Sequence, residues 1–223
     1  MKNLYQIILY QPLFKLLIFF YQHFYDLGLA IIFLTILVRL VLLPFFYKSS
    51  KDQAIIQKIS PKIKEIQKNH KDDLNAQTQA MLALYKEHKV NPLSSILLLI
   101  VQLPILIALY QVFLKGIPKI VAKPLFLGLI DLTKPNIVII VVAAVLTFWQ
   151  AKVSLPKDAE NKTAAMSLMP LMTPIWIIIV LCFLPSAIGL YILVSTLFSI
   201  IQQIIINKSF AFQENLSRAK DKK

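Results

Sequence analysis

The chain alternates between long apolar runs and short polar stretches, a pattern typical of an integral membrane protein. Five runs are long enough to be read as membrane spans, at residues 27–46, 93–114, 136–150, 168–184 and 186–206. A helix needs about 20 predominantly apolar residues to cross a bilayer core. The pattern therefore predicts an all-α integral membrane protein with five transmembrane helices.

Two of these runs are short for a span. The third has about 15 residues, or roughly 22 Å of helix against a hydrocarbon core of about 30 Å. The fourth is also short, and it contains Pro170 and Pro174. Because a short span is accommodated by thinning of the bilayer, we expect a locally thin membrane beside these two helices. The alternative is that the helices extend a few residues beyond the apolar runs.

Residues 1–26 form a separate N-terminal segment. Polar residues interrupt its apolar positions, and no small-residue cleavage site follows, so the segment does not read as a signal peptide. The pattern predicts an interfacial amphipathic helix from about Pro12 to Phe24. The alternative is a frayed extension of the first span.

Residues 47–92 are polar but carry apolar residues at helical spacing. Ser60 and Pro61 have the character of a helix start, and Asn69 to Asp72 fit a turn. This predicts a cytoplasmic helical hairpin between the first and second spans. The residues expected on its inner faces are Ile55, Ile59, Ile63 and Ile66, then Ala76, Ala80, Leu84 and His88.

The lysines and arginines between the spans predict the topology. If residues 47–92 are cytoplasmic, that side carries nine there, three in residues 151–167 and five in residues 207–223. The opposite side carries two in residues 1–26 and four in residues 115–135. By the positive-inside rule the N-terminus lies outside and the C-terminus in the cytoplasm. The expected location is the bacterial plasma (inner) membrane, with multiple spans.

Composition supports a membrane protein and excludes several other classes. The chain is 57% hydrophobic with a mean hydropathy of +0.68, whereas soluble domains are about 45–50% apolar. A net charge of +13 on a soluble protein would suggest nucleic acid, but here the lysines flank apolar runs and fit topology and anionic lipid. No recognition of a specific nucleic-acid sequence is expected. A single cysteine permits no internal disulfide, and four glycines provide no phosphate-binding loop.

Arg39 is the most informative residue of the first span. Every aspartate and glutamate of the chain lies outside the five apolar runs, so no span offers this arginine an acidic neighbour. Burying a guanidinium in a bilayer costs at least about 2.5 kcal/mol. At about 1.5 Å per residue, Arg39 is expected on the order of 10 Å from the cytoplasmic end of the span. We expect it to face a wet cavity and attract acidic groups of a substrate. The alternative is a structural arginine that snorkels or bonds to backbone carbonyls.

Further polar residues inside the spans are candidate neighbours of Arg39. They are Thr35 one turn earlier, Gln102 in the second span, and Ser195, Ser199 and Gln202 on one face of the fifth. Together these side chains predict a polar groove that receives a substrate. Hydrogen bonding between helices is an equally good explanation for each of them alone.

The sequence does not indicate an enzyme. All three histidines lie outside the spans, so an intramembrane serine would have no buried base to activate it. No pair of acids lies in the membrane, and neither HExxH nor a nucleotide-binding motif occurs. We therefore expect no catalytic residue, no metal and no cofactor.

Four segments, taken together, resemble the YidC family of membrane protein insertases (the oxidase-assembly/YidC superfamily). They are GLAIIFLTILVRLVLLPF, the hairpin SPKIKEIQKNHKDD, LYKEHKVNPLSSILLLIVQLPILIALYQVF and LPSAIGLYILVSTLFSIIQQIIINK. They follow the family's order and spacing from about Tyr10 to Lys208. The resemblance implies a five-span core at residues 27–206 whose hydrophilic groove opens to lipid and cytoplasm but is closed outside. It implies that Arg39 is the groove arginine and that Gln102 lines the groove.

The resemblance also implies a function and partners. The protein would act as an insertase and chaperone that moves short polar segments of nascent membrane proteins through the groove and releases their apolar spans into the bilayer. It would work alone or with the Sec translocon, with the signal recognition particle receptor and the ribosome as further candidate partners. The chain departs from the family at Ile192, where an aromatic residue often follows the Leu-Tyr pair.

Three questions stay open at the level of sequence. The basic cytoplasmic tail, residues 207–223, would contact either ribosomal phosphates or anionic lipid. A small transporter that binds an anionic solute at Arg39 is a second possible function, although no internal repeat is evident. A third is an assembly factor that binds partner subunits and inserts nothing.

Overall fold

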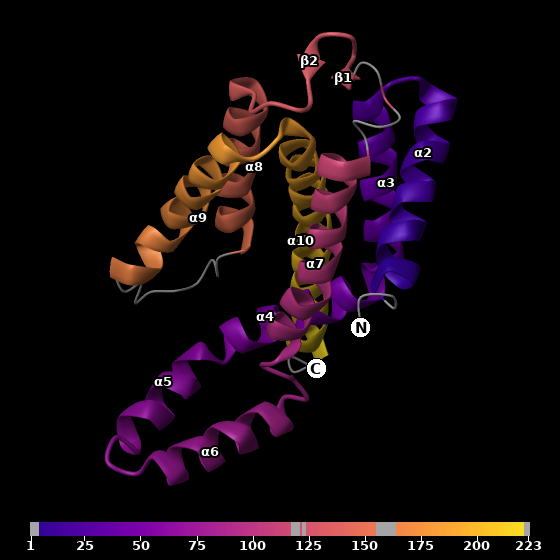
Figure 1. Ribbon diagram of the computed structural model, residues 1–223. Coiled ribbons are helices and arrows are strands. Elements are labelled where there is room, and N and C mark those ends of the chain that lie inside the picture. Colours follow the sequence, from indigo (N-terminus) through magenta and orange to yellow (C-terminus); the bar gives the residue numbers. More distant parts are fainter. Residues whose placement is uncertain (1–4, 117–120, 122–123, 155–163, 221–223) are drawn as a thin grey trace. The chain divides into compact units, whose positions relative to one another are not determined.

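The computed structural model describes residues 5–116, 121, 124–154 and 164–220, although the side chains of 95, 98–99, 115–116, 164–171 and 210–220 lie outside this description. The described chain is helical apart from one pair of short strands (Figure 1). It divides into two compact units, which we describe separately. The first contains Met1–Leu42, Val101–Leu155 and Glu160–Gln202, and the second contains Leu43–Ile100, Pro156–Ala159 and Gln203–Lys223.

The first unit begins with two helices that lie side by side, α2 (Gln11–Phe24) and α3 (Leu27–Val41) (Figure 1). A π-helical turn, η1 (Gln6–Tyr10), precedes α2, so helix begins before the expected start at Pro12. Proline has no N–H to donate but is tolerated in the first turn, and the π-helical turn continues the chain into α2. By length and composition residues Gln6–Phe24 could cross a membrane. The interfacial location of this helix therefore stays a prediction.

The span predicted at residues 27–46 is interrupted in the structure, and it stays a prediction that the two pieces form one span. α3 ends at Val41, and α4 (Leu43–Lys58) begins after a break at Leu42. Pro44 explains the break, because it cannot donate a hydrogen bond to the carbonyl of Leu40, four residues earlier. That carbonyl instead accepts from the N–H of Leu42.

The later helices are longer than the apolar runs that predicted them. α8 is Ile137–Ser154 with 18 residues, and α9 is Ala164–Phe183 with 20 residues. Both helices therefore extend beyond their apolar runs, as the alternative interpretation expected. Their lengths do not support a locally thin membrane. α7 (Ser94–Gln111) continues into a π-helical turn, η2 (Val112–Gly116).

α10 (Ser186–Lys220) is a single helix of 35 residues, so helix continues through the boundary expected at residues 206–207. No proline follows Pro185, and residues 207–220 include good helix formers such as alanine, glutamine, glutamate, arginine and lysine. Residues 221–223 of the predicted tail lie outside the described residues.

Within the described residues, three helices are long and apolar enough to cross a membrane. They are Gln6–Phe24, Ile137–Ser154 and Ser186–Ser209. The interrupted pair α3 and α4 makes a fourth if it counts as one span, and Ile100–Leu114 and Met172–Phe183 are shorter apolar helices. The fold is thus mostly helical with three or four candidate spans.

The core of the first unit lies between α2, α3, α7 and α10. Its most buried large side chains include Leu17, Ile31, Leu34, Leu109 and Ile188. A second cluster, formed by Ile140, Ala143 and Leu181, joins α8 to α9. These contacts hold α3, α7 and α10 together, and those three helices carry all the candidate groove residues.

A strand pair that the sequence pattern did not predict lies at one end of the first unit. β1 (Leu125–Phe126) pairs antiparallel with β2 (Ile130–Asp131) in the register Leu125 to Asp131 and Phe126 to Ile130. Phe126 packs on Gly28, where a Cβ atom would meet the phenyl Cδ2 at 2.0 Å. The strand pair therefore depends on a glycine at the start of α3.

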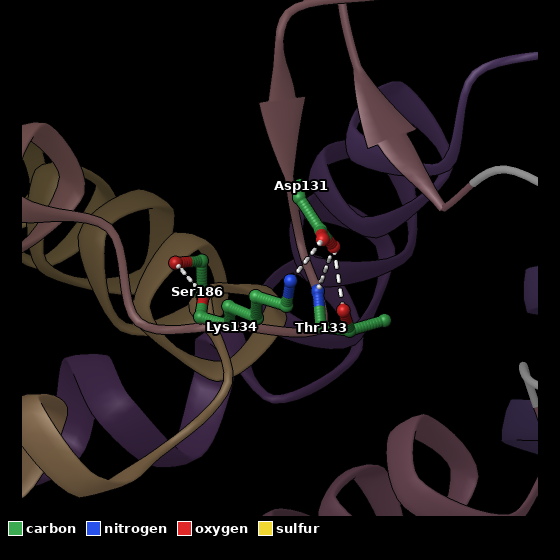
Figure 2. A network of polar contacts seen from close by, with 4 residues as sticks. All are labelled: Asp131, Thr133, Lys134 and Ser186. Carbon is green, nitrogen blue, oxygen red and sulfur yellow. Dashed lines mark hydrogen bonds and ion pairs between the residues drawn. The ribbon is translucent and has the colours of Figure 1, made fainter.

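Two groups of hydrogen bonds attach this hairpin to the helices. Asp26 Oδ1 accepts from the N–H of Leu29 (2.8 Å) as the N-cap of α3, and its Oδ2 accepts from the N–H of Leu127 (2.6 Å). After β2, the carbonyl of Lys134 accepts from Ser186 Oγ (2.5 Å) at the start of α10 (Figure 2). We call the Tyr25–Asp26 turn, β1, β2 and residues 132–136 the β-end of the first unit.

The second unit contains a helical hairpin at the residues where the sequence predicts one, and its cytoplasmic placement stays a prediction. α4 ends at Lys58, α5 (Ser60–Asn69) has Pro61 in its first turn, and α6 (Leu74–Glu87) is capped by Asp73. α5 packs on α6, with Ile59, Leu84 and Val90 buried at the centre of an apolar cluster. Within the same unit, Ser94 Oγ at the start of α7 donates to the buried carboxylate of Asp52 on α4.

Candidate functional site

Arg39 lies in the last turn of α3, closer to a helix end than the sequence suggested. It is 8% exposed, and α3 ends two residues later at Val41. A cation near a helix C-terminus interacts favourably with the partial negative charge of the last carbonyls. The local fold thus offers a buried guanidinium some compensation from the helix dipole, although it remains a charge largely removed from water.

Thr35 lies one turn before Arg39 and is 1% exposed. Its hydroxyl donates to the carbonyl of Ile31 at 2.6 Å, within the same helix. This bond occupies the hydroxyl proton, so Thr35 can offer a ligand only its oxygen lone pairs. The structure therefore places Thr35 next to the arginine but gives its hydroxyl a local structural bond as well.

Gln102 on α7 reaches across to α10. Its Nε2 donates to the phenol oxygen of Tyr191 at 2.5 Å, and Tyr191 is 3% exposed. Tyr191 also lies close enough to Arg39 to interact with it electrostatically. Three helices that are distant in sequence thus bring the buried Arg39 and Tyr191 together with the half-buried Gln102. We call these three side chains the arginine cluster.

The remaining predicted residues follow Tyr191 along α10. Ser195 is one turn further on and 4% exposed, and Gln202 is two turns beyond Ser195 and 7% exposed. Neither Ser195 Oγ nor Gln202 Nε2 has a hydrogen-bond partner among the described residues. Between them, Ser199 Oγ donates to the carbonyl of Ser195 at 3.0 Å. Buried polar atoms without partners require an explanation, and water or an arriving polar ligand would supply it.

Sequence reasoning missed Tyr191. The sequence presents it only as part of a Leu-Tyr pair, and a tyrosine in an apolar run is usually a core residue with one polar atom. A signal was nevertheless present, since Tyr191, Ser195, Ser199 and Gln202 recur at intervals of four, four and three residues. That spacing places the phenol on the same helix face as the polar side chains.

The described residues contain no group of three or more histidine, cysteine, aspartate or glutamate side chains arranged to hold a metal ion. The chemistry of the arginine cluster is that of a buried cation surrounded by hydroxyl and amide groups. Such a cluster can attract carboxylates and hydrogen-bond to peptide groups, but it has no nucleophile paired with a base.

Residues 19–214 match the model of the family described as "60Kd inner membrane protein", which covers most of the chain. The chain belongs to this family. Its curated relatives are YidC membrane protein insertases, so the resemblance found in the sequence is confirmed.

The YidC relatives differ in length. An insertase from Geotalea uraniireducens is 35% identical over 89% of this chain but only 37% of its own length. One from Clostridium tetani is 36% identical over 82% of this chain and 83% of its own length. The chain therefore spans little more than a third of some YidC proteins and most of others.

A solved structure agrees with the family assignment. The crystal structure of an active YidC insertase, with its first transmembrane domain resolved, matches with a TM-score of 0.65 and 26% identity. The match covers 85% of this chain and 45% of the other. The chain therefore has a YidC-like fold and is a multi-pass membrane protein.

Proposed function

We propose that this protein is a membrane protein insertase and chaperone. Its substrates are nascent membrane proteins, whose short polar segments pass through a hydrophilic groove lined by the arginine cluster and by Thr35, Ser195, Ser199 and Gln202. Their apolar spans are then released into the bilayer. Family membership supports this activity, as does the fold shared with an active YidC insertase.

The observation that carries the proposal is the burial of Arg39 beside Tyr191, together with the polar face of α10. A buried charge is costly in a bilayer, and such residues usually mark a pathway or a ligand site. Ser195 Oγ and Gln202 Nε2, for which the described residues supply no hydrogen bond, favour a wet site over a dry helix interface.

The physics of insertion fits such a site. Moving a peptide group through hydrocarbon without a hydrogen bond costs several kcal/mol. A wet groove that reaches part of the way across the membrane lowers this barrier. Arg39 attracts acidic residues of the translocated segment, and burial of the following apolar span supplies the driving force. No nucleotide is needed.

The proposed topology follows the lysine distribution. The five-span core is formed by α3 with α4, then α7, α8, α9 and α10, with the N-terminus outside and the C-terminus in the cytoplasm. The hairpin of α5 and α6 then lies in the cytoplasm, where it recruits or gates substrates. The protein works alone or with the Sec translocon, and the signal recognition particle receptor and the ribosome are candidate partners.

Substitution of Arg39 tests the proposal. Arg39→Ala, Arg39→Lys and Arg39→Glu are expressed in cells depleted of their own insertase, and insertion of a single-span substrate with an acidic outer tail is measured. We expect Arg39→Lys to support insertion and Arg39→Ala and Arg39→Glu to fail at equal protein levels. A matched substrate with a neutral tail should depend less on the charge.

Two outcomes would overturn the proposal. If Arg39→Ala inserts both substrates as well as the original protein does, the arginine is structural. If the original protein fails to insert either substrate but takes up an anion into vesicles, the chain is a transporter.

A further inference from the structure

We propose that the tip of the β1–β2 hairpin is a lipid anchor, whose Leu127 and Leu129 enter the interfacial region of the membrane at the β-end of the first unit. This inference concerns a surface at the opposite end of α3 from Arg39 and does not depend on the proposed function. It rests on the exposure of the tip, on its rigid attachment and on its position beside the ends of candidate spans.

The tip presents apolar side chains that the protein does not cover. Leu129 is 85% exposed and Leu127 is 61% exposed. Tyr25, in the turn that binds the tip through its neighbour Asp26, is 84% exposed. Isolated exposed leucines are common, but here two leucines and a tyrosine gather around one short turn.

A leucine at position 127 is unusual because of the backbone conformation of the turn. Leu127 has a φ of 51° and Gly128 a φ of 70°, so both central residues of the turn are in the left-handed region. Glycine, asparagine and aspartate are the residues that favour such positions, and a leucine there is conformationally unfavourable. Around Gly128, a Cβ atom would find nothing within 4 Å. Because the Leu127 side chain is itself mostly exposed, packing inside the protein does not explain a leucine here, whereas contact with lipid would.

The tip is held firmly in place. Asp26 Oδ2 accepts from the N–H of Leu127, while Oδ1 of the same carboxylate caps α3 through Leu29. Phe126 packs on Gly28 in the first turn of α3. The two leucines are thus presented at a fixed level beside the start of α3 and are not carried on a loose loop.

The hairpin tip lies next to residues at which candidate spans begin. The span Ile137–Ser154 begins five residues after Leu132, and the span Ser186–Ser209 begins at Ser186, which is bonded to Lys134. Ile137 and Val138 are 69% and 57% exposed, so the lipid-facing surface of α8 reaches the β-end. Tyrosine is enriched where spans meet the headgroups, as expected for Tyr25. This continuity with the lipid-facing surface identifies lipid as the occupant.

Site-directed fluorescence tests the anchor. In a Cys182→Ala background, Leu129→Cys and Leu127→Cys are labelled with an environment-sensitive dye, and the full chain is reconstituted into phosphatidylcholine–phosphatidylglycerol vesicles. Val145→Cys, at an exposed position of α8, serves as the lipid-facing reference. Lys134→Cys, whose side chain is 80% exposed, serves as the water-facing reference. Quenching is measured with lipids that carry a nitroxide near the headgroup and with aqueous iodide.

We expect dye at Leu129 and Leu127 to lose fluorescence with the shallow nitroxide lipid and to resist iodide, in contrast to dye at Lys134. Quenching by iodide to the extent seen at Lys134, with no effect of the nitroxide lipid, would overturn the anchor. Resistance to both quenchers would also overturn it, because the tip would then be covered by protein. The two labelling sites are independent, so a failure to reconstitute one variant leaves the test intact.

Discussion

Gln102 and Tyr191 are 89 residues apart in the chain, yet Gln102 Nε2 donates to Tyr191 Oη at 2.5 Å. The bond joins α7 to α10, and Tyr191 also interacts electrostatically with Arg39 on α3. Because the Gln102 amide donates to the phenol oxygen, the phenol proton stays available for another acceptor. The pair therefore positions a hydroxyl beside the arginine.

Tyr191→Phe removes this hydroxyl and keeps the ring. We expect the free energy of unfolding to fall by about 1 kcal/mol, because the half-buried Gln102 amide loses its acceptor. We also expect weaker insertion of substrates with acidic tails. Thermal unfolding in detergent and an insertion assay measure the two effects. Tyr110→Phe makes the same change at a more exposed tyrosine of α7, 39% exposed. Equal behaviour of the two variants would contradict the role of Tyr191.

Gly28→Ala should destabilise the β-end. The new Cβ would lie 2.0 Å from Phe126 Cδ2 and 2.6 Å from Phe126 Cβ, so the strand itself would have to move. Overpacking of this kind costs about 1–3 kcal/mol. A double-mutant cycle with Phe126→Ala checks the cause, because the smaller residue should remove most of the penalty. Simple additivity of the two changes would show that the clash is relieved in another way.

Asp26 has two separable contacts, and two substitutions distinguish them. Asp26→Ala loses both the cap of α3 and the bond to Leu127, with a cost of about 1 kcal/mol for the cap alone. Asp26→Ser restores a capping oxygen but has no second carboxylate oxygen for the hairpin. Hydrogen exchange should therefore show protection restored at the N–H of Leu29 and still lost at that of Leu127. Protection of both amides in Asp26→Ser would disprove the division of roles.

The β-end should loosen in acid. The Thr133 hydroxyl and N–H donate to Asp131 and lower the pKa of its carboxyl (Figure 2). The positive charge of Lys134 lowers this pKa further, by less than either hydrogen bond does. Because the folded pKa is depressed, the stabilisation is present above the ordinary pKa of an aspartate and is lost as the pH falls through the lowered value. The carboxylate is well exposed, so the contribution is small.

Thr133→Val tests this pH dependence, since it removes the hydroxyl and keeps the shape of the side chain. The pKa of Asp131 should rise towards its ordinary value, and the N–H of residue 133 should lose protection at a higher pH than in the original protein. Carboxyl NMR and hydrogen exchange measure these changes. An Asp131 titration that the substitution does not move would contradict the assignment of the hydroxyl as the main cause.

The parts of the fold that depend on local pattern could be predicted. Apolar runs indicated α3, α7, α8, α9 and α10, and the isoleucines of residues 55–66 indicated the buried face of the α5–α6 pair, whereas α4 was not expected as a separate helix. Helix ends were less predictable. Pro44 ends α3 before the apolar run ends. In contrast, α10 continues far beyond its run because no proline interrupts it.

The candidate site was predicted only in part. Arg39 and Gln102 could be identified because a polar residue in an apolar run is conspicuous, but their common neighbour Tyr191 is chemically ambiguous in sequence. The β1–β2 pair was missed because two-residue strands have no periodicity. Their pairing is stabilised by contacts distant in sequence, such as Asp26 with Leu127.

By itself the sequence determined that this is a helical membrane protein of the YidC family, because hydropathy and residue order are properties of the chain. It also determined which polar side chains lie within apolar helices. The tertiary structure alone decided which of them meet. Whether a hydroxyl or an amide is satisfied depends on atoms brought within about 3 Å by the packing of α3, α7 and α10, and no pattern along one helix specifies that distance.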